Sequence, residues 1–312
     1  LYAAYTVHIS NPKVNDRDRQ LRQLNTKIEQ KLEFVHITKT GGTTIEREGC
    51  LGGVIWGSMH YFEDLFECKS SDIKAWKNEK HVTYDMVSPW HMPPRIMYRR
   101  IDDEMNPYLG LSKLFTVVRN PYTRWVSEYY CPFAGYKGAD KNNEDTMNEW
   151  VKNNILTLER AYANYTERQK ASKTPWKIEP PVEFGKHFIN QYEYVFDFTG
   201  IKLVDHVLHY EHMKTDFDGL MLRYDYNLTL PSISEMHTYR TDVLLDKKLT
   251  WKNLSDSTVV AINRFAASDF GAFGYKPVQT LYQSETYSPD PHDGVCTKFR
   301  PGESRSCLRE AE

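Results

Sequence analysis

The chain lacks the features that mark several common protein classes. No apolar run approaches the ~20 residues that cross a bilayer, and the formal net charge is only −2 over 312 residues. A charge so close to balance argues against a broadly basic nucleic-acid binder. There is no CxxC pair, no Cys/His spacing typical of zinc, and no GxxxxGK[ST] loop of the nucleotide triphosphatases. What remains is a globular protein whose 40% hydrophobic residues can bury one sizeable core.

A short apolar stretch that ends in glycines is the most informative feature present. Residues 32–46 read LEFVHITKTGGTTIE, which is a strand-forming run, a glycine break and threonines that can open a helix. Such a turn presents backbone N–H groups and the positive end of a helix to one point, and Lys39 adds a full charge. The glycines let the backbone approach an anion closely. The stretch predicts an anion-binding turn, and the alternative is an ordinary strand-to-helix turn with a capping Thr.

A second stretch, LFTVVRNPYTRWVSEYY at residues 114–130, repeats this arrangement. Its first residues read as a buried strand, Arg119 stands at the strand end, and Pro121 suits the first turn of a helix. Ser127 projects from that helix. Two anion sites of this kind on one parallel sheet suit a nucleotide that is phosphorylated at both ends.

At this point the sequence resembles the sulfotransferases that use 3′-phosphoadenosine 5′-phosphosulfate (PAPS). The HITKTGGTT stretch is most similar to the Golgi heparan sulfate 6-O and 2-O enzymes, and residues 204–231 and 269–275 resemble later family segments. The resemblance implies that PAPS is the cosubstrate and adenosine 3′,5′-bisphosphate the product. It also assigns the two ends of the nucleotide to residues of this chain. The 5′-phosphosulfate would be held by Lys39, Thr40, Gly41, Gly42, Thr43 and Thr44, and the 3′-phosphate by Arg119 and Ser127.

The patterns and the resemblance together predict an α/β protein with a P-loop-like three-layer fold, a central mostly parallel sheet flanked by helices. We expect an N-terminal stem or docking helix at 1–31, the sulfotransferase domain at 32–280 and a C-terminal tail at 281–312. Within the domain, helical patterns cover 144–155, 213–224 and 256–270, and a strand pattern covers 204–210. Residues 164–183 are polar and contain prolines, which favours a surface excursion. Asp256 or Ser257 is expected to cap the last helix.

The acceptor side of the site is expected between the two turns, where Pro89, Pro93 and Pro94 make residues 83–100 rigid. In the resembling enzymes a His of this region is the general base, which His91 matches, and a His suits that role near neutral pH. The alternatives for the base are His60 and Glu46. Further residues are assigned to substrate or nucleotide: Trp90 and His60 as sugar contacts, Arg95, with Arg99 and Arg100, as contacts to an acidic acceptor, and Arg240 as a nucleotide contact.

These assignments predict sulfuryl transfer to a glycan hydroxyl by in-line attack, with His91 as the base, Lys39 stabilising the leaving oxygen, and no metal. One alternative keeps the chemistry but sulfates a small metabolite or a protein tyrosine. Another is a nucleotide kinase or phosphate-binding module, against which the missing GK[ST] and the lack of an acidic strand end for Mg²⁺ both count.

The resemblance further implies the Golgi lumen and a type II membrane protein, with an anchor upstream of Leu1. Three N-glycosylation sequons, at Asn164, Asn227 and Asn253, are compatible with a lumenal protein. Cys296 and Cys307 flank a polar segment and are expected to form a disulfide. Cys68 is left with two possible partners, Cys50 and Cys131.

Overall fold

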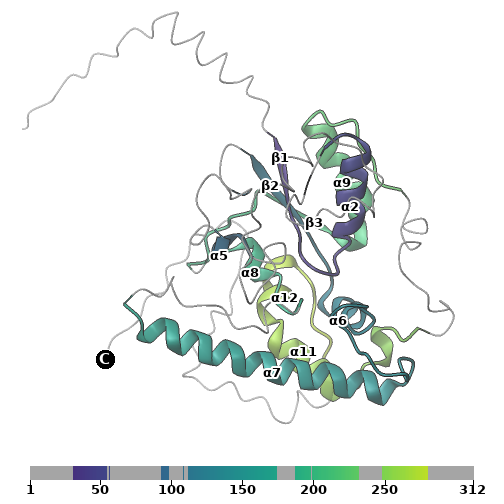
Figure 1. The fold of residues 1–312 in the computed structure, drawn as a ribbon, viewed down its shortest axis with the longest axis vertical. Coiled ribbons are helices and arrows are strands. Elements are labelled where there is room, and N and C mark those ends of the chain that lie inside the picture. Colours follow the sequence, from purple (N-terminus) through teal and green to yellow (C-terminus); the bar gives the residue numbers. More distant parts are fainter. Residues whose placement is uncertain are drawn as a thin grey trace, which may run out of the picture.

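The computed structural model describes residues 31–54, 56, 93–97, 108, 112–173, 187–197, 199–231 and 248–279. Along this part of the chain, strands and helices alternate (Figure 1). The elements are β1 (Leu32–Val35), α2 (Gly42–Leu51), α5 (Pro94–Met97), β2 (Lys113–Val118), α6 (Pro121–Tyr129), α7 (Glu144–Ala171), α8 (Tyr192–Val195), β3 (His206–His209), η5 (Tyr210–His212), α9 (Met213–Arg223), η8 (Trp251–Asn253), α11 (Asp256–Phe265) and α12 (Ala267–Phe273).

The three strands form one parallel sheet in the order β1, β2, β3. Phe34 of β1 pairs in register with Phe115 of β2, and Thr116 of β2 pairs with Val207 of β3. The Thr116 hydroxyl also donates to the Val35 carbonyl at 2.7 Å, which ties the two strands together inside the core. Because all strands run the same way, the loops after β1 and β2 emerge at one edge of the sheet.

Helices cover both faces of the sheet, which confirms the predicted three-layer α/β fold (Figure 1). On one face, Phe34 and Phe115 pack with α2 and α9, whose Ile45 and Phe217 are fully buried. On the other face, Val35 lies in a cluster with residues of α8 and α12. The alternation of side chains along each strand sends neighbouring residues to opposite cores, as the pleat of a strand requires.

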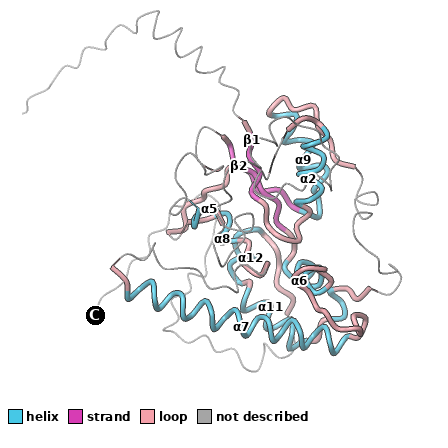
Figure 2. Tube along the Cα trace, in the orientation of Figure 1, coloured by secondary structure: helices cyan, strands magenta, loops and turns pink. Residues whose placement is uncertain are grey.

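A third hydrophobic cluster lies beside the sheet, where α6, α7 and α11 meet (Figure 2). Trp125 of α6 stacks on Phe188, with ring centroids 5.4 Å apart, and contacts the Trp150 ring of α7 edge to face. Ile262 of α11 is fully buried in the same cluster. This core holds α6 in place, and α6 carries the second predicted anion-binding turn at its N-terminus.

Two helix predictions need correction. The helix predicted at 144–155 continues to Ala171 as α7, so the surface excursion predicted for 164–183 is wrong for its first part. The buried stripe of the helix continues through Leu158 and Tyr165, and this periodicity outweighs the polar residues between them. The helix predicted at 256–270 breaks into α11 and α12.

The predicted cap of the last helix was also one or two residues too late. Ser255, rather than Asp256 or Ser257, caps α11 by accepting a hydrogen bond from the Thr258 N–H. In the part of the chain that the structure describes, no helix combines the length and apolar character needed to span a bilayer.

Candidate functional site

The first predicted anion-binding turn lies between β1 and α2, and we call residues 38–44 the lysine turn. Lys39 has a left-handed backbone with φ of 63°, and Gly41 follows with φ of 90°. These conformations turn the chain sharply enough for α2 to begin at Gly42. The first N–H groups of α2 therefore point out of the helix at the edge of the sheet. Together with the Lys39 ammonium group they make a positive helix end of the kind that binds phosphate or sulfate.

The two glycines of the lysine turn are needed for internal packing. A Cβ atom on Gly42 would lie 2.5 Å from the His36 ring. A Cβ atom on Gly41 would lie 2.9 Å from the sulfur of Met213 and 3.2 Å from the Tyr210 ring. The sequence had suggested only the approach of a ligand as the reason for these glycines. The structure adds a close approach of the turn to neighbouring side chains.

Two polar side chains near the lysine turn are used inside the protein. The Thr40 hydroxyl donates to the Ile37 carbonyl at 2.8 Å, and Thr40 is fully buried. A contact of Thr40 with a nucleotide would therefore involve its backbone. Glu46, one of the alternative bases, makes a buried hydrogen bond with His36 at 2.8 Å. Thr43 is exposed and Thr44 half-buried, so both hydroxyls are accessible at the start of α2.

The second predicted turn lies between β2 and α6, and we call residues 119–123 the arginine turn. The Arg119 side chain donates from Nη1 to the Lys39 carbonyl at 3.1 Å and from Nε to the Thr123 hydroxyl at 3.1 Å. Its guanidinium lies over the Tyr210 ring, 4.1 Å from the centroid. The lysine and arginine turns are therefore in direct contact. Ser127 lies half-buried further along α6.

The arginine guanidinium retains hydrogen-bonding capacity. Five N–H groups are available on an arginine, and within the described residues the Nη2 donors of Arg119 have no acceptor. Burial lowers the pKa of Arg119 from its ordinary value, while Tyr210 and Glu211 act in the opposite direction. A desolvated cation with unused donors is well suited to an anionic partner.

Gln191 and Asp269, which the sequence reasoning missed, hold the backbone of the arginine turn. The Gln191 side chain accepts from the Arg119 N–H at 2.7 Å and donates to the Arg119 carbonyl at 2.9 Å. Asp269, only 1% exposed, accepts from the Gln191 and Tyr192 N–H groups at 3.1 and 2.8 Å. The one available signal was the DFGAFGY segment that contains Asp269, and it gave no hint of this partner.

Arg124, on α6, fixes the start of the lysine turn through hydrogen bonds to Thr38. Its Nε donates to the Thr38 carbonyl at 3.1 Å, and its Nη2 donates to the Thr38 hydroxyl at 3.2 Å and the His187 carbonyl at 3.0 Å. Thr38 in turn donates its hydroxyl to the same His187 carbonyl at 2.8 Å. A buried arginine with three acceptors fixes the turn to α6, so Arg124 is a positioning residue.

Lys248 is a further cation near the lysine turn that the sequence did not single out. Burial lowers the pKa of Lys248, and repulsion from Lys39 lowers it further. Its ammonium group also lies over the Tyr130 ring, 5.4 Å from the centroid. Two lysines close enough to repel each other create a positive potential that an anion between them would relieve.

The remaining predicted site residues divide into two groups. Arg95 is half-buried on α5 and pairs with Glu193, and burial lowers the pKa of its guanidinium. An acceptor contact by Arg95 stays a prediction, and it would have to be made alongside this internal ion pair. The others lie outside the described residues: His91, His60, Trp90, Arg240, Arg99 and Arg100.

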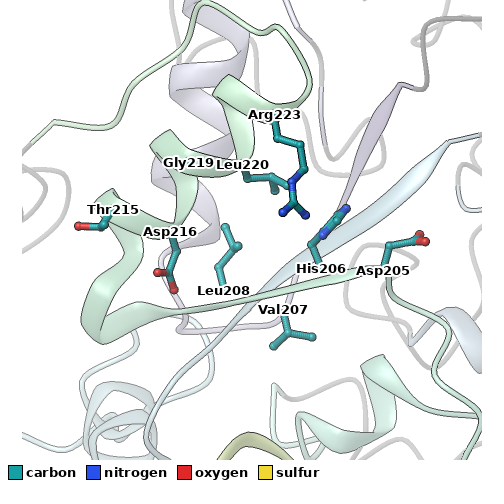
Figure 3. A pocket seen from close by; sticks show the side chains of 9 residues that line it. All are labelled: Asp205, His206, Val207, Leu208, Thr215, Asp216, Gly219, Leu220 and Arg223. Carbon is teal, nitrogen blue, oxygen red and sulfur yellow. The ribbon is translucent and has the colours of Figure 1, made fainter. Parts of the chain in front are cut away.

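A separate hollow lies between β3 and α9 (Figure 3). It has a volume of about 500 Å³, and Asp205, His206 and Arg223 contribute polar groups to it. None of the predicted site residues lines this hollow. The candidate functional site is therefore the sheet edge where the lysine and arginine turns meet.

Comparison with known families identifies the class of enzyme. A profile described as "Sulfotransferase family" matches residues 22–276, which include both turns and their supports, and the chain belongs to this family. The protein is a sulfotransferase, and such an enzyme needs a sulfonate donor such as PAPS and a hydroxyl-bearing acceptor. The predicted family and enzyme class are thus confirmed. No curated protein and no solved structure matched the chain.

Proposed function

We propose that this sulfotransferase moves the sulfuryl group of PAPS to a hydroxyl of a glycan. In this proposal the lysine turn binds the 5′-phosphosulfate through the Lys39 ammonium group and the N–H groups that begin α2. Arg119 and Ser127 bind the 3′-phosphate. The donor supplies an activated sulfuryl group, and the chain supplies cations and N–H groups at both ends of the nucleotide.

The observation that carries the proposal is the 3.1 Å hydrogen bond from Arg119 to the Lys39 carbonyl. It brings together two turns that are 80 residues apart in the sequence. One doubly phosphorylated nucleoside can therefore reach both turns. The unused Nη2 donors of Arg119 and the neighbouring charges of Lys39 and Lys248 support anion binding at this edge.

The transfer step needs a base and a stabilised leaving group. His91 takes the proton of the acceptor hydroxyl while the acceptor oxygen forms a bond to sulfur. The bond from sulfur to the 5′-phosphate oxygen breaks, and adenosine 3′,5′-bisphosphate leaves. Lys39 and the first N–H groups of α2 stabilise the negative charge on that oxygen. The assignment of His91 rests on the family resemblance, with His60 and Glu46 as alternatives, and the buried pairing of Glu46 with His36 disfavours Glu46.

The glycan acceptor and the compartment follow from the resemblance to the heparan sulfate 6-O and 2-O enzymes. Trp90, His60 and Arg95 are the proposed acceptor contacts, and Arg240 is a proposed nucleotide contact. The Golgi lumen, a type II anchor and the Cys296–Cys307 disulfide belong to the same proposal. Cys131 is a free thiol, so it is not the disulfide partner of Cys68. Cys50 remains as the proposed partner.

A thermal shift assay tests nucleotide binding. Adenosine 3′,5′-bisphosphate at a hundredfold excess over Kd should raise the melting temperature by roughly 5–10 °C. ATP with Mg²⁺ should raise it far less. Lys39→Gln removes the positive charge but keeps a long, polar side chain at this left-handed position. It should abolish most of the shift. Lys252→Ala, an exposed lysine on η8, is the matched control and should keep it.

Two outcomes contradict the proposal. A larger shift with ATP than with the bisphosphate would assign the site to another nucleotide. Equal shifts in wild type and Lys39→Gln would remove the lysine turn from the binding site. A second experiment tests the acceptor by incubating labelled PAPS with glycans, tyrosine peptides and small alcohols. Transfer of label to tyrosine peptides alone would mean that the acceptor is a protein tyrosine and not a glycan.

A further inference from the structure

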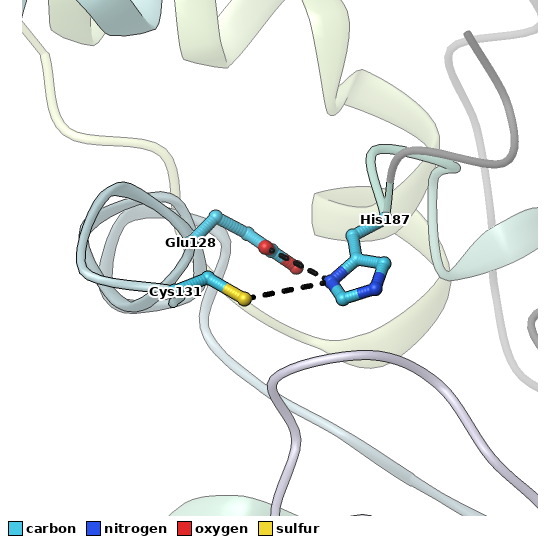
Figure 4. Close-up of side chains that lie close together, drawn as sticks. All are labelled: Glu128, Cys131 and His187. Atoms are coloured by element: carbon cyan, nitrogen blue, oxygen red, sulfur yellow. Dashed lines mark hydrogen bonds and ion pairs between the residues drawn. The ribbon is translucent and has the colours of Figure 1, made fainter. Parts of the chain in front are cut away.

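Three side chains with metal-binding atoms lie close to one another (Figure 4). Glu128 comes from the last turn of α6, Cys131 follows directly after that helix, and His187 precedes α8. The Cys131 sulfur is 3.8 Å from the His187 Nδ1 atom, and the Glu128 Oε2 atom is 3.5 Å from the same nitrogen. All three donor atoms lie within 4.8 Å of one another. No step of the proposed sulfuryl transfer uses these residues.

The carboxylate of Glu128 is unusual because it is buried without a hydrogen bond. Glu128 is only 2% exposed, and within the described part of the chain neither of its oxygens accepts a hydrogen bond of ordinary geometry. The His187 Nδ1 atom lies 3.5 Å from the Glu128 Oε2 atom, which is an ion-pair distance rather than that of an ordinary hydrogen bond. Buried carboxylates normally accept hydrogen bonds or bind a metal, so this group calls for a further partner.

We propose that Glu128, Cys131 and His187 bind one Zn²⁺ ion. Tetrahedral zinc with ordinary bond lengths places a sulfur and a nitrogen ligand about 3.6 Å apart, and a nitrogen and an oxygen ligand about 3.4 Å apart. The observed separations of 3.8 and 3.5 Å need only small shifts to match these values. A thiolate, an imidazole and a carboxylate are ligands that zinc accepts together. The fourth position is left for water or another ligand.

The charges around the cluster are compatible with a bound dication. Zn²⁺ with one thiolate and one carboxylate is neutral overall, so the nearby Lys39 does not repel the filled site strongly. Zinc binds the thiolate form of cysteine, so binding at Cys131 releases the thiol proton to solvent.

The proposed ion would stabilise the lysine turn through His187. The His187 carbonyl accepts hydrogen bonds from Thr38 and Arg124, and His187 itself has a left-handed backbone with φ of 75°. Zinc bound to the His187 ring would hold this strained residue against α6. The ligands are spaced too irregularly for the sequence to signal the site, because His187 lies 56 residues after Cys131.

Metal analysis of the purified protein tests the proposal. After removal of any metal-binding tag, incubation with Zn²⁺ and desalting, wild type should retain about one zinc per chain. Cys131→Ser and Glu128→Gln, which keep side-chain size, should retain almost none. The matched control His212→Gln, which changes an exposed histidine of η5, should retain as much as wild type. Zinc retention that is unchanged in Cys131→Ser, or absent in wild type, would overturn the proposal.

Cobalt provides a second readout that does not depend on how well the variants fold. Wild type loaded with Co²⁺ should show the near-ultraviolet charge-transfer absorption of a cobalt–thiolate bond and the visible bands of a tetrahedral site. A Co²⁺ complex without the thiolate absorption would also overturn the proposal. Neither readout uses nucleotide or turnover, so a failure of the metal site is distinguishable from a failure of the PAPS assignment.

Discussion

The lysine turn and the arginine turn occupy neighbouring positions at the same sheet edge, but different kinds of contact hold them. The arginine turn has, besides its long-range contacts, a set of contacts among its own residues. The Asn120 side chain accepts from the Tyr122 N–H at 3.0 Å, Pro121 opens α6, and Thr123 donates to the Asn120 carbonyl at 3.0 Å. These are the cap and first-turn contacts that a local sequence pattern can specify.

The lysine turn is held from a distance. Thr38 bonds to His187, which is 149 residues away, and to Arg124, which is 86 residues away. Gly41 packs against Met213 and Tyr210. At its N-terminus α2 has no side-chain cap. A turn that relies on partners so far along the chain depends on the folded state of the rest of the protein, so it should be the more sensitive of the two.

Gly42→Ala should have the largest effect because its added methyl group would clash inside the packed lysine turn. The added Cβ atom would lie 2.5 Å from the His36 ring, which is fixed by its buried pairing with Glu46. Overpacking of this kind costs about 2–3 kcal/mol. We expect the free energy of unfolding to fall by that amount, and the thermal shift with adenosine 3′,5′-bisphosphate to disappear. Denaturant unfolding and the shift assay measure the two effects.

Gly219→Ala is the matched control for this variant. Gly219 is exposed within α9, and a Cβ atom there meets nothing within 4 Å. Alanine favours a helix interior over glycine by about 1 kcal/mol, so Gly219→Ala should be slightly more stable than wild type and should bind nucleotide normally. A Gly42→Ala variant as stable as wild type would mean that the lysine turn adapts freely.

Gln191 and Asp269 form one of the long-range supports of the arginine turn, and Asp269→Asn tests how much this support contributes. Asp269 accepts three hydrogen bonds from the backbone and side chain of Gln191 and the backbone of Tyr192, and Gln191 brackets the Arg119 peptide. Asparagine keeps one acceptor oxygen, but its amide NH₂ group is a donor and would face N–H donors of Gln191 or Tyr192. We expect a loss of about 2 kcal/mol in unfolding free energy and a weaker affinity for the bisphosphate.

Asp256→Asn, at the exposed start of α11, is the control for Asp269→Asn and should change stability by less than about 0.5 kcal/mol. If Asp269→Asn lowers stability but leaves bisphosphate affinity unchanged, the arginine turn does not need its distant support. Isothermal titration with the bisphosphate separates the two effects.

The same contrast explains how much could be predicted from the sequence. The strands and the starts of α2 and α6 follow local sequence patterns, and their predicted positions were confirmed. The extension of α7 to Ala171 was missed because sparse buried residues such as Leu158 and Tyr165 were outweighed by polar neighbours. Partners such as Gln191 for Arg119 could not be predicted, since contacts over 72 residues leave no local pattern.

Asn120→Ala should have the smallest effect, although it changes a residue of the arginine turn itself. Removing the side chain that accepts from the Tyr122 N–H costs about 1 kcal/mol, the ordinary value for an N-cap. The neighbouring contacts from Gln191 to the Arg119 peptide remain, so bisphosphate affinity should fall by less than about threefold.

Asn153→Ala, an exposed position inside α7, is the control, and it should be neutral or slightly stabilising because alanine is the better helix former. Urea unfolding of Asn120→Ala, Asn153→Ala and wild type gives the comparison. A loss in Asn120→Ala as large as that in Gly42→Ala would show that both turns are equally dependent on the whole fold. The distinction between a locally specified turn and one held by distant residues would then be wrong.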